Sequence, residues 1–273
     1  MQQSVVIDCF PESVARYRKG YAVVAIDVIR ATTMAISAVA AGWRCYAVPT
    51  LEAARSLQRK LDNPILAGEL GGDIPAGFDM NNSPVDLAAR TDSHRPLILL
   101  SSSGTQLIHE SARCEAAYLA CLRNYTAMTE YLVGRHRRIA LIGAGSRGEF
   151  REEDEMCCAW IARGLMWHGY QAENASTRER INHWNNAPTA AGFVGHSVDY
   201  LRRTGQLRDL DFILGHLDDL NAIFSLREGQ IAMIHGGEPV PSSVKHTSTA
   251  ARVPNVTTDV EAVGQEVPEP RAQ

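Results

Sequence analysis

The chain is organised around the stretch Ala25-Ile26-Asp27-Val28-Ile29-Arg30-Ala31-Thr32-Thr33, which carries an acid, an arginine and two adjacent hydroxyls. The residues 21–26 form a continuous apolar run, typical of a parallel strand that is covered on both faces. The residues 34–41 are rich in alanine and predict a helix. Asp27 is therefore expected at the carboxyl end of a strand, the edge of an open α/β sheet at which ligands bind.

Two interpretations of this junction are open. In the first, Arg30 offers a forked donor, Thr32 and Thr33 offer hydroxyls, and the helix N-terminus offers free N–H groups, so that together they bind a phosphate or a carboxylate. In the second, Asp27 and Thr33 only cap the helix and Arg30 is a surface charge, because capping residues are common at such junctions. The junction alone does not decide between them.

Composition narrows the classes of function. The chain has 273 residues, of which 45% are hydrophobic, enough to fill the core of one large α/β domain or two small ones. A formal charge of −4 and a pI near 6.1 favour a small-molecule ligand over nucleic acid. The sequence shows neither a signal peptide nor an apolar run of membrane length, so we expect no membrane partner and a cytoplasmic location. The six cysteines include no Cys-x-x-Cys pair, so structural zinc is not expected.

Strand and helix patterns alternate along the chain, which predicts an α/β fold with a mostly parallel or mixed sheet and helices on both faces. We expect one domain at 1–236, with a division into two sub-lobes left open, and a disordered tail at 237–273. The polar region 173–205 is expected to be structural. The predicted strands are 4–9, 21–26, 44–48, 65–67, 96–100, 116–120, 138–142 and 231–234, and the main predicted helices are 34–41, 51–61, 125–132 and 156–167.

A loop of unusual composition is predicted at 68–84, where glycine, proline and acids interrupt any regular element. Ser83 and Pro84 are explained as a helix N-cap and first helical residue. Glu69 and Asp79 have no such explanation. Acids near a phosphate site are candidates to hold Mg²⁺, which prefers oxygen ligands.

Two further loops follow predicted strands. Residues 101–105 read Ser-Ser-Ser-Gly-Thr and can form a phosphate cradle, although serine-rich turns are also common linkers. Residues 143–148 match the dinucleotide pattern Gly-x-Gly-x-x-Gly, but the acids at 149 and 152–155 would repel a pyrophosphate. The second loop therefore fits a helix start or a metal better than a nicotinamide cofactor.

In the same order along the chain, these motifs resemble those of the 2-phosphosulfolactate phosphatase family, over about residues 5 to 235. The resemblance implies an α/β fold and Mg²⁺-dependent hydrolysis of the phosphate ester of a 2-hydroxy acid, a step toward coenzyme M. The motifs are Asp27 to Thr33, Ala67-Gly68-Glu69, Gly77-Phe78-Asp79 with Asn82-Ser83-Pro84, Ser103-Gly104-Thr105, and Gly143-Ala144-Gly145 with Glu153-Asp154.

The sequence departs from the family pattern at two positions. Leu70 stands where the family carries an arginine, and Ser103 stands where it carries an asparagine. Each change removes a polar group near the expected anion, so a paralogue with another phosphorylated acid, or a catalytically altered homologue that only binds a ligand, stays open. A nicotinamide-dependent enzyme is the third alternative, and a homodimer is compatible with all three.

The resemblance and the chemistry of phosphate esters together give roles to named residues. Asp27, Arg30 and Glu69 are the expected catalytic residues. A nucleophilic role for Asp27 is less favoured, because residue 29 is Ile and the Asp-x-Asp arrangement of aspartyl-phosphate enzymes is absent. The expected Mg²⁺ ligands are Asp27, Glu69 and Asp79, with Asp154 as a fourth candidate, and the expected substrate and phosphate ligands are Thr32, Thr33, Asn82, Ser102, Ser103, Gly104 and Thr105.

Overall fold

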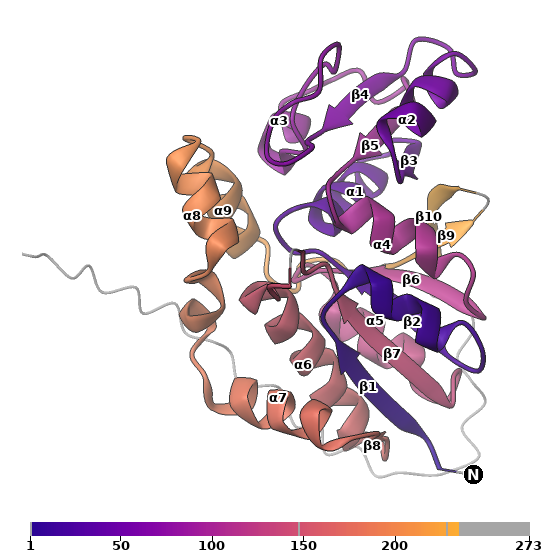
Figure 1. Cartoon of the computed structure of the whole chain (residues 1–273), viewed down its shortest axis with the longest axis vertical. Coiled ribbons are helices and arrows are strands. Elements are labelled where there is room, and N and C mark those ends of the chain that lie inside the picture. The colour runs from indigo at the N-terminus through magenta and orange to yellow at the C-terminus, as the bar shows by residue number, and fades with distance from the viewer. Residues whose placement is uncertain (1, 147, 228, 235–273) are drawn as a thin grey trace, which may run out of the picture. The chain divides into compact units, whose positions relative to one another are not determined.

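The computed structural model describes residues 2–146, 148–227 and 229–234 (Figure 1), and the predicted tail at 237–273 lies outside the described residues. The described chain is an α/β fold around a ten-stranded mixed sheet with the order β4-β5-β3-β10-β9-β6-β2-β7-β1-β8. The strands are β1 (Ser4–Asp8), β2 (Ala22–Ile26), β3 (Cys45–Val48), β4 (Ile65–Gly68), β5 (Leu97–Leu100), β6 (Ala116–Ala120), β7 (Arg138–Gly143), β8 (Gln171–Ala172), β9 (Ile223–Arg227) and β10 (Gln230–Ile234).

The sheet consists of two parallel groups joined by a hairpin. One group contains β8, β1, β7, β2 and β6, and the other contains β3, β5 and β4. Between them lie β9 and β10, and the β6/β9, β9/β10 and β10/β3 pairs are all antiparallel. Three successive reversals mean that the two groups run in opposite senses along the sheet. Because each strand is rotated by roughly 20–25° from its neighbour, their carboxyl ends can still converge on one place.

Helices cover both faces of the sheet. They are α1 (Ala31–Ala40), α2 (Leu51–Gln58), α3 (Pro84–Ala88), α4 (Gly104–Ser111), α5 (Tyr125–Leu132), α6 (Glu152–Trp167), α7 (Ala175–Asn186), α8 (His196–Arg203) and α9 (Leu207–Gly215), with 3₁₀ helices η1 (Pro11–Tyr17) and η2 (Thr189–Phe193). No helix in the described part of the chain has the length and apolarity to cross a membrane.

Strand β2 shows why the apolar run at 21–26 has no polar alternation. Its residues Ala22, Val24 and Ile26 pack in one hydrophobic cluster with α5, α6 and α7, whereas Val23 and Ala25 pack in a second cluster with α1, α4 and η1. Every residue of β2 is buried. The prediction of a strand covered on both faces is confirmed.

The sequence-based boundaries differ from the structure mainly at helix starts. Helix α1 begins at Ala31 rather than 34, and α6 begins at Glu152 rather than 156, because the polar residues at both starts belong to the first helical turn. The sequence analysis did not predict α7 or β9. The Ser83 cap is confirmed, because its hydroxyl accepts a hydrogen bond from the Asp86 N–H.

Candidate functional site

The threonines of the strand-end motif, residues 25–33, close the turn between β2 and α1. The Thr32 hydroxyl accepts from the Asp27 N–H at 2.9 Å and donates to the Asp27 carbonyl at 2.8 Å. The Thr33 hydroxyl donates to the Val28 carbonyl at 2.8 Å. Both threonines are buried. Their hydroxyls therefore hold the backbone of the motif. Neither threonine caps the helix, because the N-cap residue of α1 is Arg30 and no side chain makes a cap hydrogen bond there.

The Asp27 carboxylate lies against the start of α4. A Cβ atom on Gly104 would collide with Asp27 Oδ2 and would lie 2.6 Å from the Ala31 Cβ, so only glycine fits there. Burial, with a smaller contribution from the charge of Glu69, raises the pKa of Asp27 to about 7, although the Ala31 N–H and nearby arginines oppose the shift. A buried carboxylate of this kind is ready to receive a cation.

Both carboxylate oxygens of Asp154 accept hydrogen bonds from backbone N–H groups that follow two neighbouring strands. One of its oxygens accepts from the Val28 N–H at 2.7 Å, and the other accepts from the Ala144 N–H at 3.0 Å. Its pKa is raised well above the ordinary value, first by burial and then by the charges of Asp27 and Glu153. Asp154 therefore fastens the turn after β2 to the turn after β7, and the structure places it behind the motif.

Glu69 organises the serine loop at 101–103. Its Oε1 accepts from the Ser102 N–H at 2.7 Å, and its Oε2 accepts from the Ser102 hydroxyl at 2.9 Å and the Gly72 N–H at 2.8 Å. These bonds link the loop after β4 to the loop after β5. Ser101 and Thr105 bond to each other: each backbone N–H donates to the other residue's hydroxyl, and the Thr105 hydroxyl donates to the Ser101 carbonyl. Thr105 therefore has a structural role.

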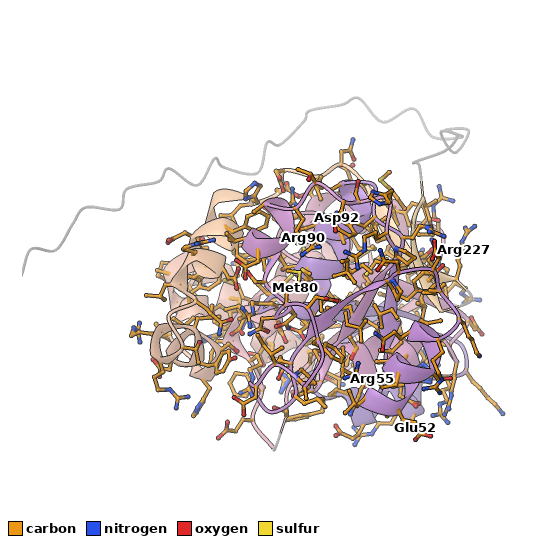
Figure 2. The ribbon with its side chains drawn as sticks, turned by 90° about the horizontal axis from the view of Figure 1, so that it is seen from above. Glu52, Arg55, Met80, Arg90, Asp92 and Arg227 are labelled. Atoms are coloured by element: carbon orange, nitrogen blue, oxygen red, sulfur yellow. The ribbon has the colours of Figure 1, made fainter. Side chains whose placement is uncertain are left out.

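The loop at 68–84 is anchored to its surroundings although it contains no long element. Arg55 of α2 donates to the carbonyls of Ala76 and Gly77, and the loop residue Met80 is buried in the second hydrophobic cluster (both residues are labelled in Figure 2). Asp79 is exposed, and its Oδ2 accepts from the Leu66 N–H at 2.8 Å. This contact directs the Asp79 side chain toward β4, away from the cavity described below.

Arg30 is buried, contrary to its interpretation as a surface charge. Its guanidinium pairs with Asp209 of α9, donates to Gln206 Oε1 at 2.5 Å and donates to Asn81 Oδ1 at 3.2 Å. Asp209 in turn accepts from the Ser83 hydroxyl at 2.6 Å. The network connects the strand-end motif, α3 and α9, so Arg30 both reaches the site and holds it together.

One cavity of about 450 Å³ collects most of the predicted residues. It is bordered by turns after β2, β4, β5 and β7, which shows that the two parallel groups do converge there. Its lining includes Asp27, Arg30, Glu69, Asn82, Ser102 and Ser103 from the predicted set, whereas Thr32, Thr33, Asp79, Gly104 and Thr105 do not line it.

The sequence analysis missed one side of this cavity. Arg151 and Glu149 come from the loop before α6, and His196, Ser197, Tyr200 and Arg203 come from α8. The region 173–205, expected to be structural, thus supplies part of the wall. The sequence does show Glu149 and Arg151 beside a glycine turn. The neighbouring acids at 152–155 drew the interpretation toward a helix start, so the arginine was not recognised.

The described residues of the turn, 143–146 and 148, lack the arrangement that a dinucleotide requires. Helix α6 begins only at Glu152, and the Ala144 N–H is occupied by Asp154. A pyrophosphate needs a helix that starts within the glycines and offers free N–H groups. The geometry gives the nicotinamide alternative no support.

The donor set for a cation consists of oxygens. Asp27 and Glu69 both line the cavity. Within the described ranges, no group of three or more His, Cys, Asp or Glu side chains is arranged to hold a metal ion. Mg²⁺ is commonly held by one or two carboxylates together with waters and substrate phosphate, so two acids beside an anion cavity fit this ion.

Carboxylates, serines and arginines line one cavity at the strand ends of this α/β protein, a composition that suits a small anionic ligand. Comparison with known proteins is more specific: the family model described as 2-phosphosulpholactate phosphatase matches residues 9–229. The chain belongs to the 2-phosphosulfolactate phosphatase family.

The relatives carry the same description. A protein of Symbiobacterium thermophilum named probable 2-phosphosulfolactate phosphatase is 32% identical over 223 residues, which cover 79% of this chain and 95% of that protein. A probable 2-phosphosulfolactate phosphatase of Pseudothermotoga lettingae is 34% identical over 142 residues, 52% of this chain and 61% of that protein. One of Thermotoga maritima is 32% identical over the same lengths. The chain thus spans about three fifths of the first relatives that it matches.

Proposed function

We propose that this protein is a phosphoric monoester hydrolase that uses Mg²⁺ to cleave the phosphate ester of a 2-hydroxy acid such as 2-phosphosulfolactate. The observation that carries the proposal is the cavity itself, which is lined by three carboxylates, three arginines and a serine-rich loop. The names of the relatives support the choice of substrate class.

The charges in the cavity suit a phosphorylated acid. Arg30, Arg151 and Arg203 provide positive charge for the oxygens of a phosphate and a second anion, because guanidinium groups bind oxyanions in forked geometry. Asp27 and Glu69 would repel the same ligand unless a cation stood between. The combination therefore favours a metal-assisted reaction over simple anion binding.

Asp27 and Glu69 would hold the Mg²⁺ ion. When bound, the ion would neutralise phosphate charge and polarise the ester, which are its usual contributions to phosphate hydrolysis. Ser103 is the N-cap residue of α4 and lines the cavity, so its hydroxyl and N–H groups at the helix start can donate to phosphate oxygens. Ser102 donates both its N–H and its hydroxyl to Glu69 and fixes the loop. Arg30 adds a fixed guanidinium, because Asp209 and Gln206 restrict its side chain. Helix α8 lines one side of the cavity and would exclude part of the bulk water from the reacting atoms.

The test is release of inorganic phosphate from a panel of phosphorylated 2-hydroxy acids, with Mg²⁺ and with a chelator. We expect release only with Mg²⁺, and the highest kcat/KM for an acid that carries two further anionic groups. Metal-dependent binding of the same compounds by calorimetry, without any release of phosphate, would instead identify a catalytically altered homologue that only binds its ligand.

A further inference from the structure

Arg151 presents an unused donor on the side of the cavity that the sequence did not reveal. Its Nη2 donates to the Ser146 hydroxyl at 2.9 Å, which fixes the guanidinium. Its Nη1 is buried and has no hydrogen-bond partner within the described residues. Because a buried charged donor without an acceptor is costly, such a group is expected to meet its acceptor in a ligand.

Glu149 marks where the acceptor would lie. A single oxygen, Glu149 Oε2, lies 3.6 Å from Arg151 Nη1 and 3.7 Å from His196 Nε2. Both distances are beyond hydrogen-bond length, and about half of the Glu149 side chain is exposed. The carboxylate therefore lies only loosely between the Arg151 guanidinium and the His196 imidazole, and it can be displaced by a ligand oxyanion.

We infer that Arg151 and His196 form a second oxyanion subsite, for a carboxylate or sulfonate of the substrate, with Glu149 as the internal anion that the substrate displaces. The subsite borders the same cavity as Asp27 and Glu69 but comes from the α6 and α8 side. Arg203 and Ser197 of α8 add positive charge and a hydroxyl to this wall. Glu149 is the acid of the lining that faces Arg151 directly.

This inference rests on the proposed function for its choice of ligands, but its test does not need catalysis. The probes are three products that lack phosphate: sulfolactate has a carboxylate and a sulfonate, lactate has only the carboxylate, and isethionate has only the sulfonate. Their binding is measured by calorimetry in buffer with Mg²⁺. The variants are Arg151→Gln, Glu149→Gln and, as a control, Arg202→Gln, whose exposed arginine pairs with Asp199 and does not line the cavity.

We expect Arg151→Gln to weaken sulfolactate binding by about 10- to 100-fold, the contribution of a charge-assisted hydrogen bond. A parallel loss with lactate assigns the subsite to the carboxylate, and one with isethionate assigns it to the sulfonate. Glu149→Gln should tighten binding by about threefold, because it removes the competing charge. Arg202→Gln should bind like the wild type.

Unchanged affinity in Arg151→Gln for all three probes would overturn the subsite. If Arg151→Gln does not fold, Glu149→Gln decides, and the absence of any tightening in that variant counts against the inference. Phosphate release is assayed separately on the phosphorylated forms. A wild type that releases no phosphate but shows the expected opposite effects of the two variants would sink the proposed enzyme and leave the anion subsite standing.

Discussion

Two regions meet at the cavity and are held in opposite ways. The strand-end motif is buried, and its threonines, its backbone and the carboxylate of Asp154 bond to one another. Helices α8 and α9 form a pair side by side (Figure 1), and α8 buries only Val198 and Leu201 while most of its surface is exposed or partly exposed. The pair is fastened to the rest of the site by Asp209 with Arg30 and by the Tyr200 hydroxyl, which donates to the Gly72 carbonyl.

This difference indicates a division of tasks. The motif holds the Asp27 side chain in a rigid, buried position. Helix α8 contributes Arg203 to the cavity from an element that buries few of its residues. Elements of low local stability are the ones that open and close in proteins. We therefore expect catalysis to depend most on the motif, and substrate selection to depend most on the helix pair.

The largest effect is expected for Asp27→Asn. The change keeps the shape of the side chain but removes the charge that would hold Mg²⁺, so kcat should fall by about 10²-fold or more. Asp79→Asn is the comparison, because the sequence proposed both acids as ligands but the structure places only Asp27 at the cavity. Steady-state kinetics and Mg²⁺ titration of both variants measure this. Equal losses would return Asp79 to the site.

The attachment of the helix pair is tested by Asp209→Asn. Asp209 and Arg30 have side chains that are each 2% exposed, so the variant leaves a buried guanidinium without its counter-charge. We expect unfolding free energy to drop by about 3–5 kcal/mol. Asp199→Asn breaks an exposed ion pair with Arg202 on α8 and should lower the unfolding free energy by no more than about 1 kcal/mol. Urea unfolding compares them, and similar small losses would mean that the pair is attached in another way.

Behind the motif, Glu153 gives a pH-dependent prediction. Its carboxylate is buried, neither oxygen has a hydrogen-bond partner in the described part of the chain, and burial followed by the charge of Asp27 raises its pKa from 4.5 to about 7. Between those two values the folded state keeps a proton that the unfolded state has lost, so stability falls as pH rises through this window and stays low above it.

Glu153→Gln removes this loss. We expect the variant to melt a few degrees above the wild type at pH 8 and at nearly the same temperature at pH 4.5. Thermal melts of both proteins at the two pH values, without metal, measure the difference. A gain of equal size at both pH values would show that packing rather than charge is responsible.

The smallest effect is expected for Leu70→Arg. Leu70 is 38% exposed and does not line the cavity, although Glu69 and Gly71 on either side do. An arginine is long enough to reach the rim, and we expect the kcat/KM ratio of phosphorylated sulfolactate to phosphorylated lactate to rise by about two- to threefold. An unchanged ratio places residue 70 out of reach of the substrate.

The sequence predicted the strand ends well for a physical reason. A strand that is buried on both faces leaves a long apolar run, and the polar residues that end it are conspicuous, as at Asp27 and at Ser101. The loop that contains Glu69 is recognised by its glycines and prolines. These signals are local, so the sequence locates Asp27, Glu69 and the serine loop without knowledge of the tertiary fold.

What the sequence could not predict depends on packing between distant segments. Arg30 meets Asp209 across 179 positions of the chain, and no local pattern relates them. His196 and Arg203 look like ordinary polar residues of an amphipathic helix until α8 is placed beside the cavity. The sequence also could not show that the hydroxyls of Thr32 and Thr33 donate to backbone carbonyls. A structural threonine and a ligand-binding threonine look the same in the sequence.

The position of the β9–β10 hairpin in the sheet affects the order in which the protein folds during synthesis. These strands are the last ones described along the chain, yet they occupy the middle of the sheet between β6 and β3. During synthesis, β3, β4 and β5 leave the ribosome before the hairpin that connects them to β6 through the sheet. Such distant pairing is slow because the chain entropy is lost before the contacts form. We therefore expect the two halves of the candidate site to reach their final register only after residue 234 has been added, so that the cavity is completed late in biogenesis.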